Sequence, residues 1–206
     1  MTDIWFLPAR HFTTANRTRV DLVVIHSAEI GKSLDGAEAL ARGFARVRFL
    51  RTCPICKADN GGAARCPTCG APSKENKSSA HYNVDADSAT QSVLETDIAN
   101  HAPGVNPISI GIELCGRARQ TAAEWDDGYS RLMLARAAKL TAAICRRWGI
   151  PVQFVSPSGL VAGVPGITTH ASVSEAFKRS THHDPGPHFP FGRFLEMVKI
   201  SGLELA

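Results

Sequence analysis

The histidine-rich stretch over residues 166–191 constrains this chain more than any other part of the sequence. It contains four of the eight histidines and ends in the turn Asp184-Pro-Gly-Pro187, followed by an aromatic and proline-rich run. The two prolines restrict the backbone around Asp184, and the glycine between them gives the turn its freedom. A carboxylate held this rigidly beside several imidazoles suits a metal site, because zinc binds histidine nitrogen and aspartate oxygen.

A third metal ligand must come from another part of the chain, because a catalytic zinc uses three protein ligands and leaves one position for water. His170 and Asp184 supply two ligands, and the best candidate for the third is His26. His26 ends the apolar run 20–26, which indicates a buried strand that delivers the histidine from its carboxyl end. Two plainer interpretations stay open, since histidine-rich loops are often solvated and strand-ending histidines often pack in a core.

Two CxxC motifs form a second candidate metal site. Cys53, Cys56, Cys66 and Cys69 lie within the short segment 53–72, and four thiolates can close a tetrahedral structural zinc site. The alternatives are two redox dithiols or two disulfides, which are disfavoured because so short a segment has no core to support them. We therefore predict a small zinc-ribbon-like insertion at this position.

Length and charge exclude several broad classes of protein. A chain of 206 residues with a formal net charge of +4 is too mildly basic to argue for nucleic-acid binding, and the ribbon segment has no aromatic residues for base stacking. The sequence shows no membrane-spanning apolar stretch and no signal peptide. We expect one domain over residues 1–206 with residues 53–72 as an inserted loop, made in the cytosol, without a nucleic-acid partner or membrane insertion.

The pattern of apolar residues predicts strands that alternate with helices, which is typical of an α/β domain. The apolar positions of the helices recur at helical spacing, and the strands are short runs bounded by turn residues. The expected strands cover residues 20–26, 80–84, 91–94, 108–115 and 152–155, and the expected helices cover residues 34–50, 126–148 and 189–200.

Six short segments carry a resemblance to a known family: Val23-Val-Ile-His26, Ser79-Ala-His-Tyr82, Asp97-Ile-Ala-Asn-His-Ala102, Ser109-Ile-Gly-Ile-Glu-Leu114, His170 and Asp184-Pro-Gly-Pro187. These segments follow one another as they do in type-2 N-acetylmuramoyl-L-alanine amidases, which are zinc enzymes related to peptidoglycan recognition proteins. The chain resembles this family over most of its length. It looks most like the amidase modules of endolysins from phages of mycobacteria and related actinobacteria.

The resemblance implies a mixed central sheet flanked by helices, with a zinc-containing cleft on one side. It implies that His26, His170 and Asp184 hold the catalytic zinc, and that Glu113 stands at the position of the catalytic glutamate. On the residues alone, Glu113 would be a solvent-facing strand residue. The implied reaction is hydrolysis of the amide between the lactyl group of N-acetylmuramic acid and L-alanine in peptidoglycan or muropeptides. The expected cofactors are two zinc ions, one catalytic and one structural.

Further site residues follow from the same resemblance. His101, Asn106 and Tyr82 are substrate-side candidates. Many relatives carry a lysine two residues before the aspartate, where it steadies the oxyanion, whereas this chain has His182. The segment from residue 170 to 184 also looks long, so the choice among His182, His183 and Asp184 stays open at this point.

Three functions compete on this sequence: an amidase used as a phage endolysin, a module that binds peptidoglycan without cutting it, and a zinc-ribbon nucleic-acid protein. Asp184 favours the amidase, because non-catalytic relatives typically lack the aspartate or cysteine ligand. An endolysin would be made in the host cytoplasm and would act on the cell wall after another factor releases it.

Overall fold

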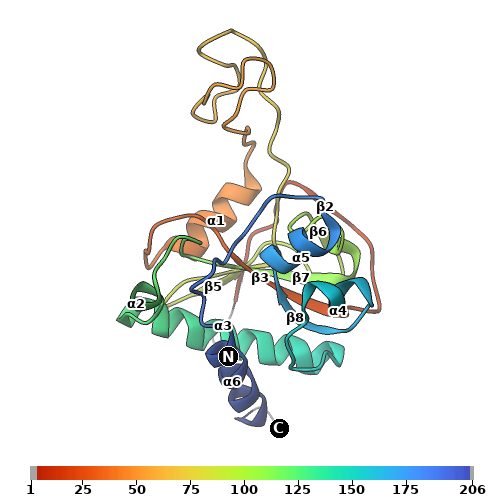
Figure 1. The fold of residues 1–206 in the computed structure, drawn as a ribbon. Helices are drawn as coiled ribbons and strands as arrows, with labels where there is room; N and C mark the ends of the chain where they lie inside the picture. Colours follow the sequence, from red (N-terminus) through yellow and green to blue (C-terminus); the bar gives the residue numbers. More distant parts are fainter. Residues whose placement is uncertain (1–3, 205–206) are drawn as a thin grey trace.

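The computed structural model describes residues 4–204, and its centre is a six-stranded mixed sheet in the order β1-β5-β4-β7-β3-β8 (Figure 1). The strands are β1 (Trp5–Phe6), β2 (Phe12–Thr13), β3 (Leu22–Ser27), β4 (Tyr82–Val84), β5 (Ala89–Gln91), β6 (Ile98–Ala99), β7 (Ser109–Leu114) and β8 (Gly166–Thr169). Strands β4, β7, β3 and β8 run parallel to one another, whereas β5 pairs antiparallel with β4 and parallel with β1. Strands β2 and β6 form a separate antiparallel pair.

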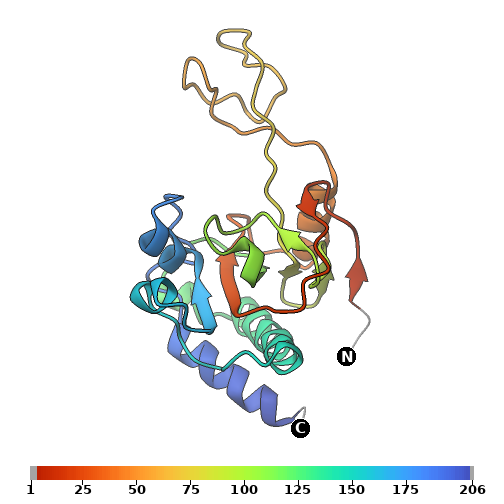
Figure 2. The same cartoon turned by 90° about the vertical axis from the view of Figure 1, so that its right-hand side faces the viewer.

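Helices cover both faces of the sheet (Figures 1 and 2). They are α1 (Gly36–Ala45), η1 (Asn106–Ile108, a 3-10 helix), α2 (Ala122–Trp125), α3 (Gly128–Trp148), α4 (Pro157–Val161), α5 (His170–Phe177) and α6 (Phe191–Glu204). Within residues 4–204, no helix combines the length and the apolar character needed to cross a lipid bilayer.

Helices α3 and α6 pack on one face and build the main core. The Asp127 side chain caps the start of α3 by accepting a hydrogen bond from the Ser130 N–H, and Gly149 ends the helix in the left-handed region at φ 68°. Because strand side chains alternate, Ile25, Ile110, Ile112 and Leu114 all point toward this core. The main core cluster includes Val23, Ile25, Ile110, Ile112, Leu114, Met133, Leu134, Ile144, Phe194 and Val198.

The opposite face of the sheet carries the functional residues. Helix α5 follows β8 directly, α1 packs on β4 and β5, and a smaller apolar cluster forms around Leu22, Val24 and Val173. His26 and Glu113 alternate with the core residues of β3 and β7, so their side chains emerge on this second face.

The predicted fold class, α/β with a mixed sheet flanked by helices, is confirmed. Three details of the prediction are wrong. Residues 152–155 do not form a strand, because the Gln153 N–H bonds back to the Pro151 carbonyl and bends the chain, leaving one bridge from Phe154 to Ile167. The strand expected at residues 91–94 lies earlier in the chain, as β5 over Ala89–Gln91. Helix α1 stops at Ala45 rather than near residue 50, because the following residues pair with the chain that returns from residue 73.

Residues 53–72 project from the body on two extended chain segments (Figures 1 and 2). These segments, residues 46–52 and 73–79, are called the stalk. The Leu50 N–H donates to the Lys74 carbonyl at 2.8 Å, and the Asn76 N–H donates to the Arg48 carbonyl at 2.7 Å. These bonds pair the two segments of the stalk with each other.

Candidate active site

Adjacent parallel strands bring His26 and His170 together at their carboxyl ends. Ile25 of β3 pairs with Thr169 of β8, so the two histidines occupy the next positions along the two strands. Their ring centroids lie 4.7 Å apart. The backbone at His170 is fixed further because Thr169 caps helix α5 by accepting a hydrogen bond from the Ser172 N–H.

The turn at Asp184 returns the chain to these strand ends. The Asp184 carbonyl accepts a hydrogen bond from the Ala171 N–H at 2.9 Å, which ties the turn to the start of α5. Gly186 has a φ of 97°, and a Cβ atom there would lie 1.8 Å from the Ala118 carbonyl oxygen, so only glycine fits. The turn thus restricts the position of the Asp184 carboxylate.

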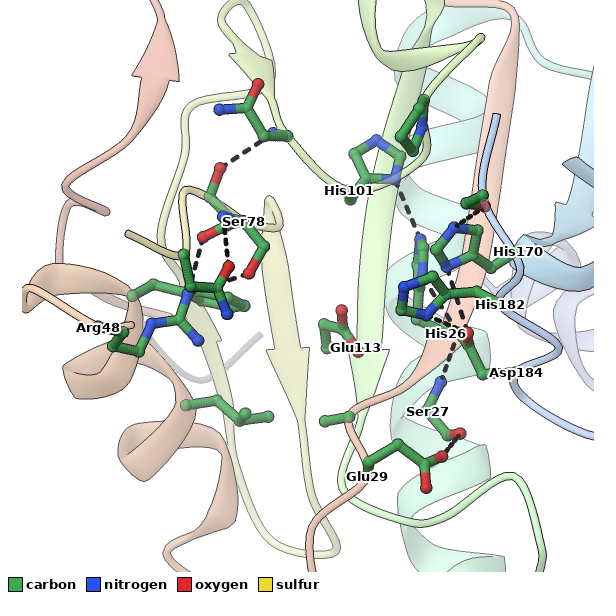
Figure 3. A pocket seen from close by; sticks show the side chains of 18 residues that line it. His26, Ser27, Glu29, Arg48, Ser78, His101, Glu113, His170, His182 and Asp184 are labelled. Carbon is green, nitrogen blue, oxygen red and sulfur yellow. Dashed lines mark hydrogen bonds and ion pairs between the residues drawn. The ribbon is translucent and has the colours of Figure 1, made fainter. Parts of the chain in front are cut away.

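The Asp184 carboxylate lies between the two histidines (Figure 3). Its Oδ2 atom is 3.2 Å from His26 Nδ1, and its Oδ1 atom is 3.2 Å from His170 Nδ1. The three side chains are buried, and one ligand atom from each lies within 4.8 Å of the others. Burial lowers the pKa of His26. Burial alone would raise the pKa of Asp184, but the neighbouring imidazoles of His170, His182 and His26 outweigh it and lower that pKa below its usual range.

These three residues fit a metal ion. A neutral imidazole and an ionised carboxylate are the forms that ligate a metal, and the pKa shifts of His26 and Asp184 favour those forms. The burial of a carboxylate at this position is otherwise costly, so a cation that binds here would offset the cost. Two nitrogens and one oxygen match a catalytic zinc set with one open position.

A hydrogen-bond chain through His101 fixes which nitrogen of His26 can ligate. His26 Nε2 lies 3.0 Å from His101 Nδ1, and His101 Nε2 lies 3.1 Å from Ser109 Oγ. Ser109 donates its hydroxyl proton to the Val105 carbonyl at 2.8 Å, so its oxygen is left to accept from His101 Nε2. His101 Nδ1 is then the acceptor for His26 Nε2–H, and His26 Nδ1 keeps its lone pair facing Asp184.

Glu113 lies beside His26 on the neighbouring strand, because the β3–β7 register pairs these two residues. Its Oε2 atom is buried and has no hydrogen-bond partner among the described residues. Burial and, to a smaller extent, the Asp184 carboxylate together raise the pKa of Glu113 to about 8, against the opposing effect of the Arg48 cation. A carboxyl group whose pKa lies near neutrality can both accept and donate a proton.

His182 completes this side of the site. Its ring stacks on His170 with centroids 4.5 Å apart, and its Nδ1 atom lies 3.5 Å from Asp184 Oδ1. The hydrogen bond to Asp184 raises the pKa of His182, and about two thirds of the side chain, 66%, is exposed. His183 is exposed and does not line the cavity that His182 lines.

A cavity of about 390 Å³ opens onto these residues. The metal-ligand candidates form one wall, Glu113 lies in the middle, and the opposite wall carries Arg48 and Ser78 of the stalk (Figure 3). A substrate in this cavity would therefore contact a metal-binding triad and a carboxyl group of raised pKa at the same time.

Residues 16–187 match the Amidase_2 family, described as N-acetylmuramoyl-L-alanine amidase. The chain belongs to this family. It is an N-acetylmuramoyl-L-alanine amidase whose buried His-His-Asp triad forms the candidate catalytic centre. Comparison with curated proteins gives no match.

Solved structures of a hydrolase, an amidase and an endolysin share the fold of this chain. Staphylococcus aureus hydrolase AmiA superposes with a TM-score of 0.65 at 14% identity, covering 98% of this chain and 83% of that chain. The amidase LysC from Clostridium intestinale gives 0.53 at 13% identity, covering 97% and 99%. A mutant endolysin from Bacillus subtilis gives 0.55 at 18% identity, covering 96% and 99%.

Two of the substrate-side candidates do not line the cavity of this amidase. Tyr82 lies on the core side of the sheet and donates its hydroxyl to Glu95 at 2.7 Å. Asn106 accepts hydrogen bonds from the His101 and Ala102 N–H groups and so holds the loop that carries His101. His101 does line the cavity. This geometry gives no support to substrate contacts by Tyr82 or Asn106.

The four cysteines of the projecting segment form a second cluster. One Sγ atom from each of Cys53, Cys56, Cys66 and Cys69 lies within 4.8 Å of the others, so the cluster could hold a metal ion. The two CxxC turns are alike: the Cys53 carbonyl accepts from the Lys57 N–H, and the Cys66 carbonyl accepts from the Gly70 N–H. Backbone N–H groups from Cys69 and Thr68 lower the pKa of Cys66, whereas the neighbouring thiols raise the pKa of Cys56.

Sequence reasoning missed the far wall of the cavity. Arg48, Asn76 and Ser78 of the stalk line it, and none of the three stands in a recognisable motif. The sequence places Arg48 within the helix expected over residues 34–50 and predicts no strand or helix over residues 73–79. One feature of the sequence did indicate that the two stalk segments lie close together. They flank the ribbon, and a four-cysteine cluster within the ribbon brings its two ends together.

Proposed function

We propose that this amidase hydrolyses the amide between the lactyl group of N-acetylmuramic acid and L-alanine in peptidoglycan, and that its catalytic metal is zinc. The observation that carries the proposal is the convergence of the His26, His170 and Asp184 triad with Glu113 on one cavity. The complete triad speaks against a module that only binds peptidoglycan.

His26 and His170, through Nδ1, and Asp184, through a carboxylate oxygen, would hold the zinc ion. Zinc supplies Lewis acidity, which polarises a carbonyl and makes water a stronger nucleophile near neutral pH. His101 keeps His26 in the tautomer that this role requires. The softer four-cysteine cluster would hold a second, structural zinc without an open position.

Glu113 and His182 would share the proton and charge chemistry. Glu113 takes a proton from the attacking water and returns it to the leaving amine, which a carboxyl group with a raised pKa can do. His182 would donate a hydrogen bond to the carbonyl oxygen as negative charge develops there. Its position in the cavity beside His170 supports this role.

The biological setting we propose is lysis of an actinobacterial host by a phage endolysin. Residues 1–206 would form one amidase domain, with residues 53–72 as an inserted ribbon. The protein would be made in the host cytoplasm and would act on the cell wall after release. We propose that the ribbon does not bind nucleic acid, because residues 53–72 contain no aromatic side chain.

The test is digestion of purified peptidoglycan by the zinc-loaded protein, with the products identified by mass spectrometry. We expect intact glycan strands and stem peptides with a free L-alanine amine. Chelation should abolish the reaction and zinc should restore it, and His170→Ala should be inactive because a ligand is lost. Cut glycosidic bonds, or cut peptide cross-links with the lactyl amide intact, would reject the assignment.

A further inference from the structure

Arg48 is a cation that faces the candidate active site from the wall opposite the metal-binding triad (Figure 3). It comes from the stalk, where the Asn76 N–H donates to its carbonyl at 2.7 Å. Its guanidinium group lies over the Phe44 ring, 4.7 Å from the centroid, and Nη2 donates to the Ser78 carbonyl and hydroxyl at 2.8 and 3.1 Å. These contacts hold the side chain in one orientation.

This guanidinium group has no anionic partner among the residues that the structure describes. Among the ion pairs of residues 4–204, none includes Arg48, and no described residue accepts a hydrogen bond from its buried Nε. The side chains that share this end of the cavity, Asn76, Ser79 and Asn100, are neutral. Burial lowers the pKa of Arg48, and Glu113 is the acidic group that opposes the shift. A guanidinium group that is held in place through Nη2, without a described anion to neutralise it, suits a carboxylate from outside the protein.

The chemistry of the substrate decides which part would reach Arg48. The inference rests on the proposed function, which puts the lactyl amide at Glu113 and the triad. On one side of that amide the glycan offers N-acetylated sugars without a free carboxylate. On the other side the stem peptide offers its first free carboxylate one residue beyond L-alanine. A cavity of about 390 Å³ holds little more than the groups that flank the cleaved bond.

We infer that Arg48 is a specificity residue that binds the α-carboxylate of the second stem-peptide residue. The peptide would then run from the triad toward the stalk, and the glycan would leave on the other side. Amidation of that α-carboxyl, a common variation in bacterial walls, would remove the negative charge and leave Arg48 unpaired. The amidase would therefore distinguish amidated from free stem peptides.

The test uses two N-acetylmuramoyl tetrapeptides that differ in whether the α-carboxyl of the second residue is free or amidated. Binding is measured by calorimetry on zinc-loaded protein that carries Glu113→Gln, and KM and kcat are measured on the active protein. We expect the free acid to bind roughly 10- to 100-fold more tightly, as for one charge-assisted contact. Arg48→Gln should remove this difference in binding and in KM, with zinc content retained.

Arg46→Gln is the matched control, because Arg46 is an exposed stalk residue that does not line the cavity. The difference in affinity and KM between the free and the amidated peptide should remain in that variant. The inference is overturned if the wild type treats the two peptides alike, or if Arg48→Gln keeps the difference. An Arg48-dependent difference in binding without any release of the L-alanine amine would instead reject the proposed function alone.

Discussion

Glu113 shows how residue-scale chemistry depends on the fold. The sequence places it on the face of a strand opposite Ile110, Ile112 and Leu114, which on its own suggests solvent exposure. The β3–β7 register instead sets it beside His26, where burial raises its pKa to about 8. Burial and the nearby Asp184 carboxylate have turned an ordinary strand carboxyl into a group that titrates near neutrality.

Replacement of Glu113 by glutamine tests its role as general base. We expect Glu113→Gln to lower kcat roughly 10²- to 10⁴-fold with zinc still bound. In the wild type, the acid-side decline of kcat/KM should have an apparent pKa lower than 8, because a bound cation favours the Glu113 carboxylate. This decline should be absent from the residual activity of Glu113→Gln. Glu175→Gln, on the exposed side of α5, is the control. Unchanged turnover in Glu113→Gln would assign the base elsewhere.

The same substitution has a consequence for stability. The pKa of Glu113 is higher in the folded chain, about 8, than its ordinary value of 4.5. The folded state therefore binds more protons between these pH values, and the stability contributed by Glu113 falls as pH rises through that window. In protein treated with chelator, Glu113→Gln should have a higher Tm than the wild type at pH 9 and a similar Tm at pH 4.

Substitution of His182 distinguishes a role as hydrogen-bond donor to the oxyanion from a role as metal ligand. His182→Ala should lower kcat roughly 100- to 1000-fold with zinc retained, because a donor to the developing oxyanion is lost. His182→Lys should recover much of the rate, and His183→Ala, at the exposed neighbour, should change little. Loss of the catalytic zinc from His182→Ala would identify His182 as a ligand instead. Unchanged turnover would place the donor elsewhere.

At the scale of elements, the apolar runs and helical spacing predicted β3, β7 and α3, which have strong local patterns. They did not predict β8 and α5, because Gly166-Ile-Thr-Thr is a short strand that β3 pairing stabilises. The triad was predictable because Asp184 and His26 stand in distinctive local sequences. Its partner His101 was named as a substrate contact, and only the packing against His26 reveals the hydrogen-bond chain.

The far wall of the cavity was not predictable for a related reason. Arg48 reaches the site because α1 ends early and the chain pairs with residues 73–79. That pairing joins segments separated by the whole ribbon, and no local pattern in either segment encodes it. Wherever a site residue is positioned by long-range pairing rather than by its own neighbours, the sequence leaves its role open.

At the scale of the whole molecule, the amidase carries two candidate metal sites with separate tasks. The triad belongs to the sheet and the segments that meet it, whereas the four-cysteine cluster belongs to residues 53–72. Figure 1 shows that these residues project from the body beyond the stalk. The stalk connects them and supplies Arg48 to the cavity. The ribbon should therefore act on substrate binding through the stalk, while the chemistry remains with the triad and Glu113.

Cys56→Ser separates the two sites. We expect two zinc ions per wild-type chain and one in the variant, because three thiolates close the cluster poorly. The Tm should fall, since the binding energy of a structural zinc contributes to folding. The kcat of folded molecules should change by less than about twofold, because the altered site is distant from the triad. The KM for free-acid peptides should rise, because a loosened stalk no longer fixes Arg48.

Cys145→Ser provides the control, since Cys145 is buried in the core on α3. It should lower the Tm while two zinc ions and the KM are retained, so a general loss of stability is distinguished from loss of the cluster. Elemental analysis, calorimetry and steady-state kinetics on the three proteins measure these quantities. One zinc ion in a fully reduced and fully active wild type would contradict a structural metal in the ribbon, and an unchanged KM in Cys56→Ser would show that the stalk holds Arg48 without the metal.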